Sequence, residues 1–430
     1  MAVAILRKIA QNGGMKRYLT LLRLRPQFRY LWLAQVISLT GDWFNVIAAV
    51  VLINRYTNSA LAVGGLFLAR ALPPFLAGPF AGVVADRFNR KAVLIVADIL
   101  RALIVSGFLL VNSAEDVWLL YVLSILQFVV SAFFEPARSA IVPSLVAENE
   151  LLTANTLSST TWSAMATLGA AIGGVTAAIF GPQTALVIDS SSFVLSALLV
   201  WQIKLPPRAD ISSNAHGNGW TDFIAGLGYV RQHPNVSVIT LVKAMGQVGS
   251  VDVMAAAYAG QVFRVGQDGA VTLGLMLAMF GVGAILGPLL GNLFHDQSAR
   301  MLQRAITAGY AVIAVGWLVL GFSPSLVWVL IGCLLRGVGG SLNWTYSDVL
   351  LQMKVPNHFL GRVFALDFGL FTLAMSASVW LTSLALDRYI LDPRWMAMIL
   401  AALSLGPFLF WAGTLRMLQA SEVVVEVSSE

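Results

Sequence analysis

Charged side chains are scarce in this chain. Of its 430 residues, 11% are Asp, Glu, Lys or Arg, whereas soluble domains carry about 25%. Apolar residues make up 58%. So few charges cannot cover the surface of a soluble protein of this size, which excludes an ordinary soluble enzyme and a disordered protein. The composition predicts an integral membrane protein that crosses the bilayer many times.

Residues that hold metals or carry out nucleophilic chemistry are also few. Cys333 is the only cysteine, so neither an intrachain disulfide nor a cysteine-based metal cluster can form. No lysine follows a glycine, which excludes a phosphate loop and an ATP-driven pump on this chain. The histidines all fall in predicted loops, which excludes a zinc or Ser-His intramembrane protease: His216, His233, His295 and His358. We therefore expect no enzyme activity, no cofactor and no metal.

The apolar stretches are long enough to cross a bilayer. About 20 helical residues, each rising about 1.5 Å, span the hydrocarbon core. Several stretches contain Gly and Pro, which membrane helices tolerate. The sequence predicts an all-α integral membrane protein with 12 transmembrane helices, at 29–54, 60–85, 92–112, 116–138, 155–180, 183–203, 237–263, 269–294, 301–322, 325–347, 362–386 and 394–418.

The twelve predicted spans form two six-helix bundles joined by a linker. Pro206-Pro207 and Gly217-Asn218-Gly219 give the segment between spans 6 and 7 a linker composition. A short amphipathic helix from Trp220 to Arg231 is expected to lie on the membrane surface within it. The predicted divisions are an N-terminal tail (1–28), a first bundle (29–204), a linker (205–236), a second bundle (237–418) and a C-terminal tail (419–430).

Basic residues gather on one side of the predicted membrane. When alternate loops are compared, the side opposite the N-terminal tail holds only Arg55, Arg264, Arg388 and Arg394. The positive-inside rule then places both termini in the cytoplasm. The net charge of +6 is therefore a topology signal, and nucleic acid is not an expected partner. We expect a monomer in the plasma membrane, the inner membrane of a bacterium, with membrane lipids around it.

The two halves repeat each other in sequence. Gly78-Pro79-Phe80-Ala81-Gly82 closes span 2, and Gly287-Pro288-Leu289-Leu290-Gly291 closes span 8, 209 residues later. An acid and a base follow each motif. Two bundles of parallel sense joined by a cytoplasmic linker are the arrangement of one large transporter fold.

The loop after span 2 carries the sharpest motif. It reads Gly82-Val83-Val84-Ala85-Asp86-Arg87-Phe88-Asn89-Arg90-Lys91 and resembles the G-x-x-x-D-R-x-G-R-K signature of the major facilitator superfamily. Asn89 stands where the family has glycine. Because Asn accepts a left-handed backbone, we expect the turn to be kept. The alternative is a positive-inside loop with an incidental acid.

Shorter pieces resemble one branch of that superfamily, the multidrug and siderophore exporters, which include macrolide efflux proteins and the enterobactin exporter. The pieces, in chain order, are Leu39-Thr40-Gly41-Asp42, Ala97-Asp98-Ile99-Leu100-Arg101-Ala102, Phe134-Glu135-Pro136-Ala137-Arg138, Ala154-Asn155-Thr156-Leu157, Leu335-Arg336-Gly337 and Gly361-Arg362-Val363. The resemblance implies secondary active, proton-coupled export of amphipathic small molecules by alternating access. A lysophospholipid transporter or lipid scramblase of the same fold is the alternative.

The resemblance also implies a cytoplasmic gate made of Gly82, Asp86, Arg87, Arg90, Lys91, Glu135 and Arg138. In the family, the acid of the motif faces the start of span 11. Carried over, Asp86 would cap the helix that opens near Gly361 and Arg362, where a helix N-terminus favours an anion. Arg90 is expected to reach Glu135. The alternative is that these are solvated surface charges.

Span 5 carries a weaker signature. Antiporters of the superfamily have a G-P-x-x-G-G run there, whereas this chain reads Gly169-Ala170-Ala171-Ile172-Gly173-Gly174. Without the proline, the run is better read as a packing motif. Gly169 and Gly173 form a face of small residues that lets another helix approach closely.

Charges inside the spans are the candidates for coupling, since each costs about 2.5–3.5 kcal/mol at the bilayer centre. Asp42 and Asp252 lie 210 residues apart and occupy matching positions in the two halves. Arg70 is expected to pair with Asp42 at the same depth, and Arg336 with Asp252. A carboxyl balanced between burial and a cation can exchange protons near neutrality. The alternative is a pair of structural ion pairs.

Other polar and aromatic residues in the spans receive structural interpretations. Asp98 and Arg101 are expected to pair within span 3, Asp189 to be hydrogen-bonded scaffold, and Lys243 to snorkel toward the interface. Trp43 and Trp344 are candidates for stacking on a drug-like substrate, with core packing as the alternative.

Overall fold

The computed structural model describes residues 14–57, 59–205, 219–291, 298–388 and 391–428. Within these ranges every regular element is helical, as the sequence predicted. Eleven helices in this part are long and apolar enough to cross a membrane. The fold is therefore the all-α membrane architecture expected from the composition.

The first half comprises a short N-terminal helix and six long ones. Short 3-10 turns at Phe108–Leu110, Ala114–Asp116, Val142–Ser144 and Glu148–Glu150 join some of them. The α-helices are α2 (Gly14–Leu24), α3 (Pro26–Tyr56), α4 (Ala60–Arg87), α5 (Arg90–Gly107), α6 (Val117–Ile141), α7 (Leu151–Phe180) and α8 (Pro182–Trp201).

The second half begins with α9 (Gly219–Gln232), which lies in the predicted linker. Short helices α10 (Pro234–Thr240), α11 (Val242–Met245) and α12 (Val251–Ala257) follow, and a π-helical turn, Tyr258–Val262, continues α12. The long helices, after a 3-10 turn at Gln267–Gly269, are α13 (Ala270–Gly291), α14 (Ala299–Gly321), α15 (Leu326–Lys354), α16 (Asn357–Arg388) and α17 (Pro393–Ser428).

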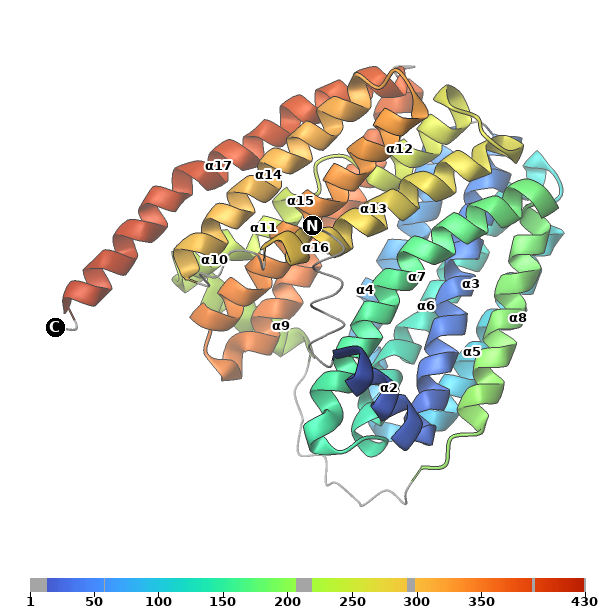
Figure 1. Cartoon of the computed structure of the whole chain (residues 1–430), viewed down its shortest axis with the longest axis horizontal. Coiled ribbons are helices and arrows are strands. Elements are labelled where there is room, and N and C mark those ends of the chain that lie inside the picture. Colours follow the sequence, from blue (N-terminus) through green and yellow to red (C-terminus); the bar gives the residue numbers. More distant parts are fainter. Residues whose placement is uncertain (1–13, 58, 206–218, 292–297, 389–390, 429–430) are drawn as a thin grey trace.

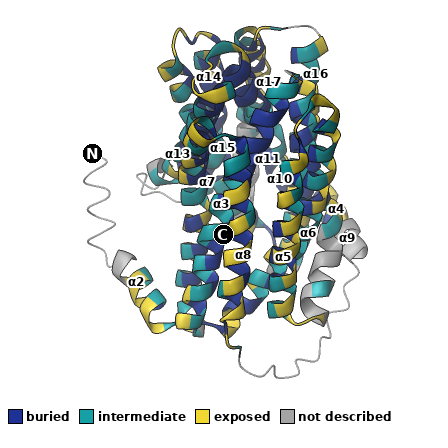
Figure 2. Ribbon diagram, turned by 90° about the vertical axis from the view of Figure 1, so that its right-hand side faces the viewer, coloured by how far each residue is buried: buried dark blue, intermediate teal, exposed yellow. Residues whose placement is uncertain are grey.

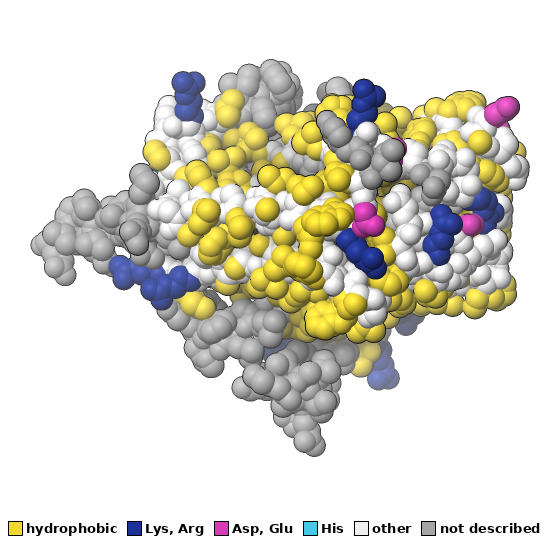
Figure 3. Space-filling view, turned by 90° about the horizontal axis from the view of Figure 1, so that it is seen from above, with side chains coloured by type: hydrophobic (Ala, Val, Ile, Leu, Met, Phe, Trp, Pro, Cys, Tyr) yellow, Lys and Arg dark blue, Asp and Glu magenta, His cyan; other side chains and the backbone are white. Residues whose placement is uncertain are grey.

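Exposed and buried residues alternate along the long helices (Figure 2), and many of the exposed ones are large and apolar. Seen from above, the molecule carries apolar side chains across its face with few charged ones among them (Figure 3). Contiguous exposed apolar surface of this kind marks contact with lipid. Exposed examples are Leu103, Leu126, Ile179 and Leu409.

Helix α3 differs from the other long helices, because neighbouring helices enclose much of it. Every residue from Phe44 to Ile53 is buried. It packs against α7 and α8 within its own half. The predicted small-residue face of α7 takes part in this packing, since a Cβ added at Gly169 would lie 3.1 Å from Cβ of Trp43 and one at Gly173 would lie 3.3 Å from Cα of Phe44. That close approach requires glycine.

The seventh predicted span, 237–263, is not one continuous helix. Its helical geometry is interrupted over residues 246–250, between α11 and α12, where Gly249 has a positive φ of 77°. Side chains of neighbouring helices bind the carbonyl groups at this break: the Trp317 indole N–H donates to the Val248 oxygen at 3.0 Å and the Tyr310 hydroxyl to the Val242 oxygen at 2.8 Å. Broken helices survive at membrane depth when protein groups satisfy the backbone in this way.

The two halves meet at one end and diverge toward the other (Figure 1). Helix α4 packs against α16, and α7 against α13. Two glycines meet in the second pair: a Cβ at Gly174 would lie 2.7 Å from the backbone oxygen of Ala270 and 2.9 Å from Cα of Gly274. In the first pair, a Cβ at Gly64 would lie 2.8 Å from Cβ of Ser383. We call this end, which carries Arg55 and Asp387, the far end.

The opposite end, the linker end, carries α2 and α9 (Figure 1). Helix α9 packs on the first turns of α16, where the Tyr229 and Phe359 rings stack with centroids 4.7 Å apart. A Cβ at Gly226 would lie 2.8 Å from the backbone oxygen of Arg362. The linker helix thus lies directly against the start of predicted span 11.

Candidate functional site

Arg70 on α4 lies among three carboxylates. Its Nη1 donates to Oδ1 of Asn45 at 3.1 Å, and its guanidinium lies 4.4 Å from the centroid of the Phe128 ring. The carboxylates whose charge acts on it are Asp42, Asp189 and Asp252. Asp42 and Asp189 come from α3 and α8 of the first half, and Asp252 comes from α12 of the second. One arginine therefore serves acids from both halves.

The charge of Arg70 acts on both Asp42 and Asp252, and Arg336 lies elsewhere. Among the described residues, however, Arg70 forms no ion pair with Asp42, so the predicted Arg70–Asp42 pair is not formed, and its hydrogen bond goes to Asn45. The predicted pairing of Asp252 with Arg336 is wrong, because the cation that acts on Asp252 is Arg70. Arg336 points between α15 and α14, with its guanidinium 4.6 Å from the Trp317 ring centroid. Its Nε and Nη1 have no hydrogen-bond partner among the described residues.

The predicted pair Asp98 and Arg101 forms within α5. Asp98 also accepts a hydrogen bond from the Ser196 hydroxyl at 2.7 Å. The Arg101 guanidinium is held between the rings of Phe134 and Phe193, at 4.2 Å and 4.4 Å from their centroids. Its charge also acts on Asp42. Arg101 is thus a fixed, paired cation next to the Arg70 group.

Asp189 belongs to the site, although the sequence indicated a scaffold role. It is fully buried, and its Oδ1 lies 2.6 Å from the position that a Cβ at Gly41 would take. The serine cluster beside it favoured the structural interpretation. Its position against α3, next to the residue that precedes Asp42, depends on helix packing, which no local pattern encodes.

A second charged cluster joins α11, α15 and α16. The Lys243 ammonium lies 2.5 Å from Oδ1 of Asp348 and 2.5 Å from Oδ2 of Asp367. The Lys243 side chain is only 4% exposed, so the predicted snorkelling is wrong. Sequence reasoning missed both acids. The signal that was available is Lys243 itself, because a lysine inside a span needs an acidic partner.

The two candidate tryptophans pack against protein groups. Trp43 packs against Gly169 of α7. Trp344 lies 4.5 Å, ring centroid to Nζ, from Lys243 and meets the Phe371 ring edge-on at 4.9 Å. Trp344 is nevertheless 38% exposed, and its proposed stacking on a substrate stays a prediction.

The predicted cytoplasmic gate is described in part. The side chains of Gly82, Asp86 and Arg87 lie outside the described residues. The expected contact between Arg90 and Glu135 is replaced by others: Arg90 donates to the Ala140 oxygen at 2.7 Å, and Glu135 pairs with Arg138 one turn along α6.

Lys91 and Asn89 have structural roles at the same end. The Lys91 ammonium donates to the backbone oxygens of Trp201 and Ile203, both at 2.7 Å, and so ties down the end of α8. Asn89 has φ −64°, so the expected left-handed turn is wrong. Its side chain instead caps α5 by accepting from the N–H groups of Lys91 and Ala92.

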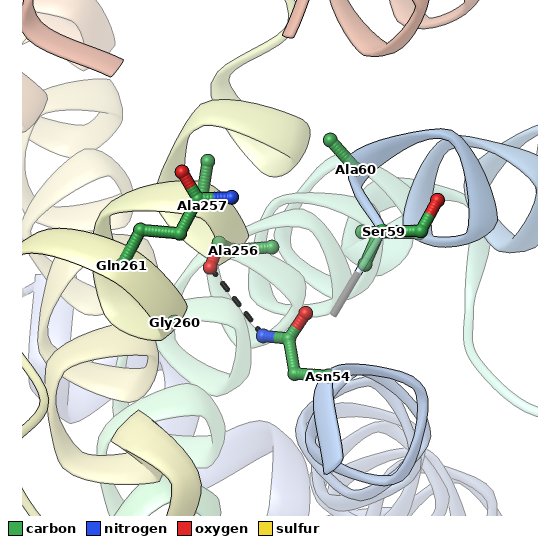
Figure 4. A pocket seen from close by; sticks show the side chains of 8 residues that line it. Asn54, Ser59, Ala60, Ala256, Ala257, Gly260 and Gln261 are labelled. Atoms are coloured by element: carbon green, nitrogen blue, oxygen red, sulfur yellow. Dashed lines mark hydrogen bonds between the residues drawn. The ribbon is translucent and has the colours of Figure 1, made fainter. Parts of the chain in front are cut away.

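Polar contacts close the far end between the halves. Asp387 at the end of α16 accepts from the N–H groups of Ala60 and Leu61 at 2.8 Å and 2.9 Å, capping α4. The Asn54 amide donates to the Ala256 oxygen at 3.4 Å across a small pocket (Figure 4). Nearby, Arg55 and Asp268 form an ion pair at 2.7 Å.

The comparison with protein families identifies the fold. The model described as Major Facilitator Superfamily matches residues 31–379. The chain belongs to the Major Facilitator Superfamily. It is a transporter, not an enzyme, and the two-bundle arrangement is that of the family.

Several members of the superfamily are similar over most of the chain. Macrolide efflux protein A of Streptococcus pyogenes is 24% identical over 368 residues, 84% of this chain and 90% of its own. A protein of Bacillus subtilis named "Putative bacilysin exporter BacE" is 24% identical over 349 residues, 80% of this chain and 84% of its own. Both names indicate efflux.

Solved superfamily structures share the fold. The nucleoside transporter NupG superposes with a TM-score of 0.69 at 12% identity, covering 91% of this chain and 98% of NupG. A bacterial homologue of the iron transporter ferroportin, in an inward-facing state, gives 0.68 at 16% identity, covering 90% and 98%.

Proposed function

We propose that this superfamily member exports amphipathic small molecules, drugs or siderophore-like compounds, in exchange for protons. The observation that carries the proposal is the Arg70 site, in which four carboxylates outnumber the two cations that act on them: Asp42, Asp98, Asp189 and Asp252 against Arg70 and Arg101. An excess of carboxylates in a buried site is costly, and binding a proton lowers that cost. The resemblance to efflux proteins supports export as the direction.

The site also supplies a reason why proton binding and bundle movement are linked. Asp252 belongs to the second half, whereas Arg70, Asp42 and Asp189 belong to the first. A proton on one of the acids changes the attraction of Arg70 for the others, and therefore the attraction between the halves. Each proton that moves inward contributes about 2.3 kcal/mol per 100 mV of membrane potential.

The polarity of the cycle follows from the basic residues. We place the linker end in the cytoplasm by the positive-inside rule. The far-end contacts then close the external side, and the diverging helices open the site toward the cytoplasm. In this state the transporter is ready to take up its substrate from the cytoplasm or the inner leaflet.

Everted membrane vesicles test the proposal. Vesicles energised to be acidic inside should accumulate erythromycin or ethidium, and an uncoupler should stop the accumulation, because the proton gradient drives export. Vesicles without the protein provide the control. If a fluorescent lysophospholipid instead moves across the membrane at the same rate after the gradient has collapsed, the protein is a lipid scramblase and the proposal is wrong.

A further inference from the structure

The Lys243 cluster has an unbalanced charge. One ammonium is shared by two carboxylates, so the three ionised groups together carry a net negative charge. The Asp367 side chain is 1% exposed, and its Oδ1 has no hydrogen-bond partner among the described residues. A buried excess charge is costly unless a further positive charge joins it.

No other charged group of the described residues supplies that positive charge. The groups that act on Asp348 are confined to Lys243, and those that act on Asp367 are Lys243 and Asp348. On the neighbouring α14, the Tyr310 hydroxyl is engaged with the Val242 oxygen. The Trp344 and Phe364 rings, 4.5 Å and 5.7 Å from Nζ of Lys243, present π faces that favour the ammonium. Among the described residues, therefore, no second cation completes the cluster, and a proton from solution would balance its charge.

One of the two acids is accessible. The Asp348 side chain is 27% exposed, whereas that of Asp367 is 1% exposed. Asp348 also lies one helical turn from Trp344, an exposed aromatic residue of α15. A proton can thus reach the cluster through Asp348 while the side chains of Lys243 and Asp367 stay buried.

The cluster also controls the position of half a span. Lys243 lies on α11, just before the break at residues 246–250, and α11 packs against both α15 and α16. Its ion pairs fasten the α10–α11 half of span 7 to these two helices. When a carboxyl binds a proton, Lys243 loses one of its two charged partners, and this half-span is held less firmly.

We propose that Lys243, Asp348 and Asp367 form a second proton-binding site, which takes up one exchangeable proton and thereby releases the α10–α11 half of span 7. The assignment deepens the proposed function and rests on it. Asp42 and Asp252 then form one proton site between the halves, and the Lys243 cluster forms another within the second half.

An infrared titration of the purified protein in lipid nanodiscs tests the site without any substrate. As the pH falls from about 8 to about 5, the carbonyl band of protonated carboxyl groups should grow in the wild type through both proton sites. The contribution of one aspartic acid to this growth should be missing from both D348N and D367N, since either change leaves one acid paired with one lysine. Glu115→Gln, at an exposed position, is the matched control and should titrate like the wild type.

The lysine variant should change the titration in the opposite direction. Without the ammonium, K243M should bind the proton at a proton concentration at least tenfold lower than the wild type does. If the cluster is only a structural ion-pair network, both Asn variants keep the full wild-type band, and the proposal is overturned. D348N, at the more exposed acid, provides the test even if D367N does not fold.

The same measurements separate this proposal from the function itself. If the infrared band is unchanged in both Asn variants while erythromycin accumulation still follows the proton gradient, the second site is wrong and the export proposal stands. If the contribution of one aspartic acid is lost from the carbonyl band of both Asn variants while transport does not follow the proton gradient, the second proton site stands and the proposed proton-coupled export is wrong.

Discussion

A single arginine links the two halves of the transporter at the level of individual residues. Arg70 faces Asp42, Asp189 and Asp252, whereas Arg101 has its own partner in Asp98. The two cations therefore differ in their charged partners. Arg101 is held by Asp98 and two rings while its charge also acts on Asp42 and Asp189, whereas Arg70 has no ion-pair partner of its own among the described residues and is outnumbered by the acids around it.

Asp42→Asn should abolish gradient-driven accumulation, reducing it by about tenfold or more. The amide keeps the shape of the side chain but cannot carry a proton, and Arg70 keeps Asp189 and Asp252, so the fold should survive. Erythromycin uptake into everted vesicles over a range of pH measures the effect, with Glu115→Gln as the control. Gradient-driven uptake by D42N with an unchanged pH profile would show that Asp42 is not the proton carrier.

At the level of helices, the sequence repeat is not matched by a structural one. Asp42 lies within the continuous helix α3, but its counterpart Asp252 follows a break in span 7. Gly249 makes the break possible, because its φ of 77° suits glycine alone. A Cβ there would lie 2.5 Å from Cδ1 of Leu400 and 2.8 Å from the Trp317 ring.

Gly249→Ala should therefore destabilise the protein, by about 1–3 kcal/mol from backbone strain alone. Thermal unfolding of the purified variant in detergent should show a lower midpoint. Gly406→Ala is the matched control, because a Cβ at Gly406 meets nothing within 4 Å and the residue is helical. Equal midpoints for Gly249→Ala and the wild type would mean that the break does not need glycine.

Helix positions could be predicted from the sequence better than helix contacts. The length of the apolar stretches predicted where the chain crosses the membrane. Depth predicted that the charges of Asp42 and Arg70 interact, although the two residues, both within the described ranges, form no ion pair. Depth does not say which way a side chain points around its helix, so Arg336 was paired with Asp252 although it faces α14. The break in span 7 was not predicted because membrane helices tolerate glycine, and the tertiary contacts that help to satisfy its backbone groups, from Trp317, Tyr310 and Thr382, leave no local pattern in the sequence.

At the level of the whole molecule, the halves are joined at the far end and diverge toward the linker end (Figure 1). Besides the packing of α4 on α16 and α7 on α13, the far end has polar contacts: the Arg55–Asp268 pair, the Asp387 cap and the Asn54 hydrogen bond. Contacts of this kind can break and re-form during a cycle at modest cost, because water replaces them when the halves separate.

Single cysteines at Asn58 and Asn214 should report opposite sides of the membrane. Asn58→Cys should react with an impermeant maleimide in intact cells, and Asn214→Cys should react only after permeabilisation. Tags at Met1 and Glu430 should likewise become accessible to an antibody only after permeabilisation. The native Cys333 is buried and provides the low background. Labelling of Asn214→Cys in intact cells would overturn the predicted orientation.

The enclosure of α3 has a consequence for how the protein is made. A helix that ends surrounded by protein still has to enter the bilayer early in synthesis, before α7 and α8 exist. Asp42 then opposes insertion by about 2.5–3.5 kcal/mol. Six Val, Ile and Leu residues between Val46 and Ile53 favour insertion by about 0.3–0.6 kcal/mol each. The apolar segment from Val46 to Ile53 therefore first offsets the cost of inserting Asp42 into the lipid, and in the folded protein it becomes the buried part of the helix that follows Asp42.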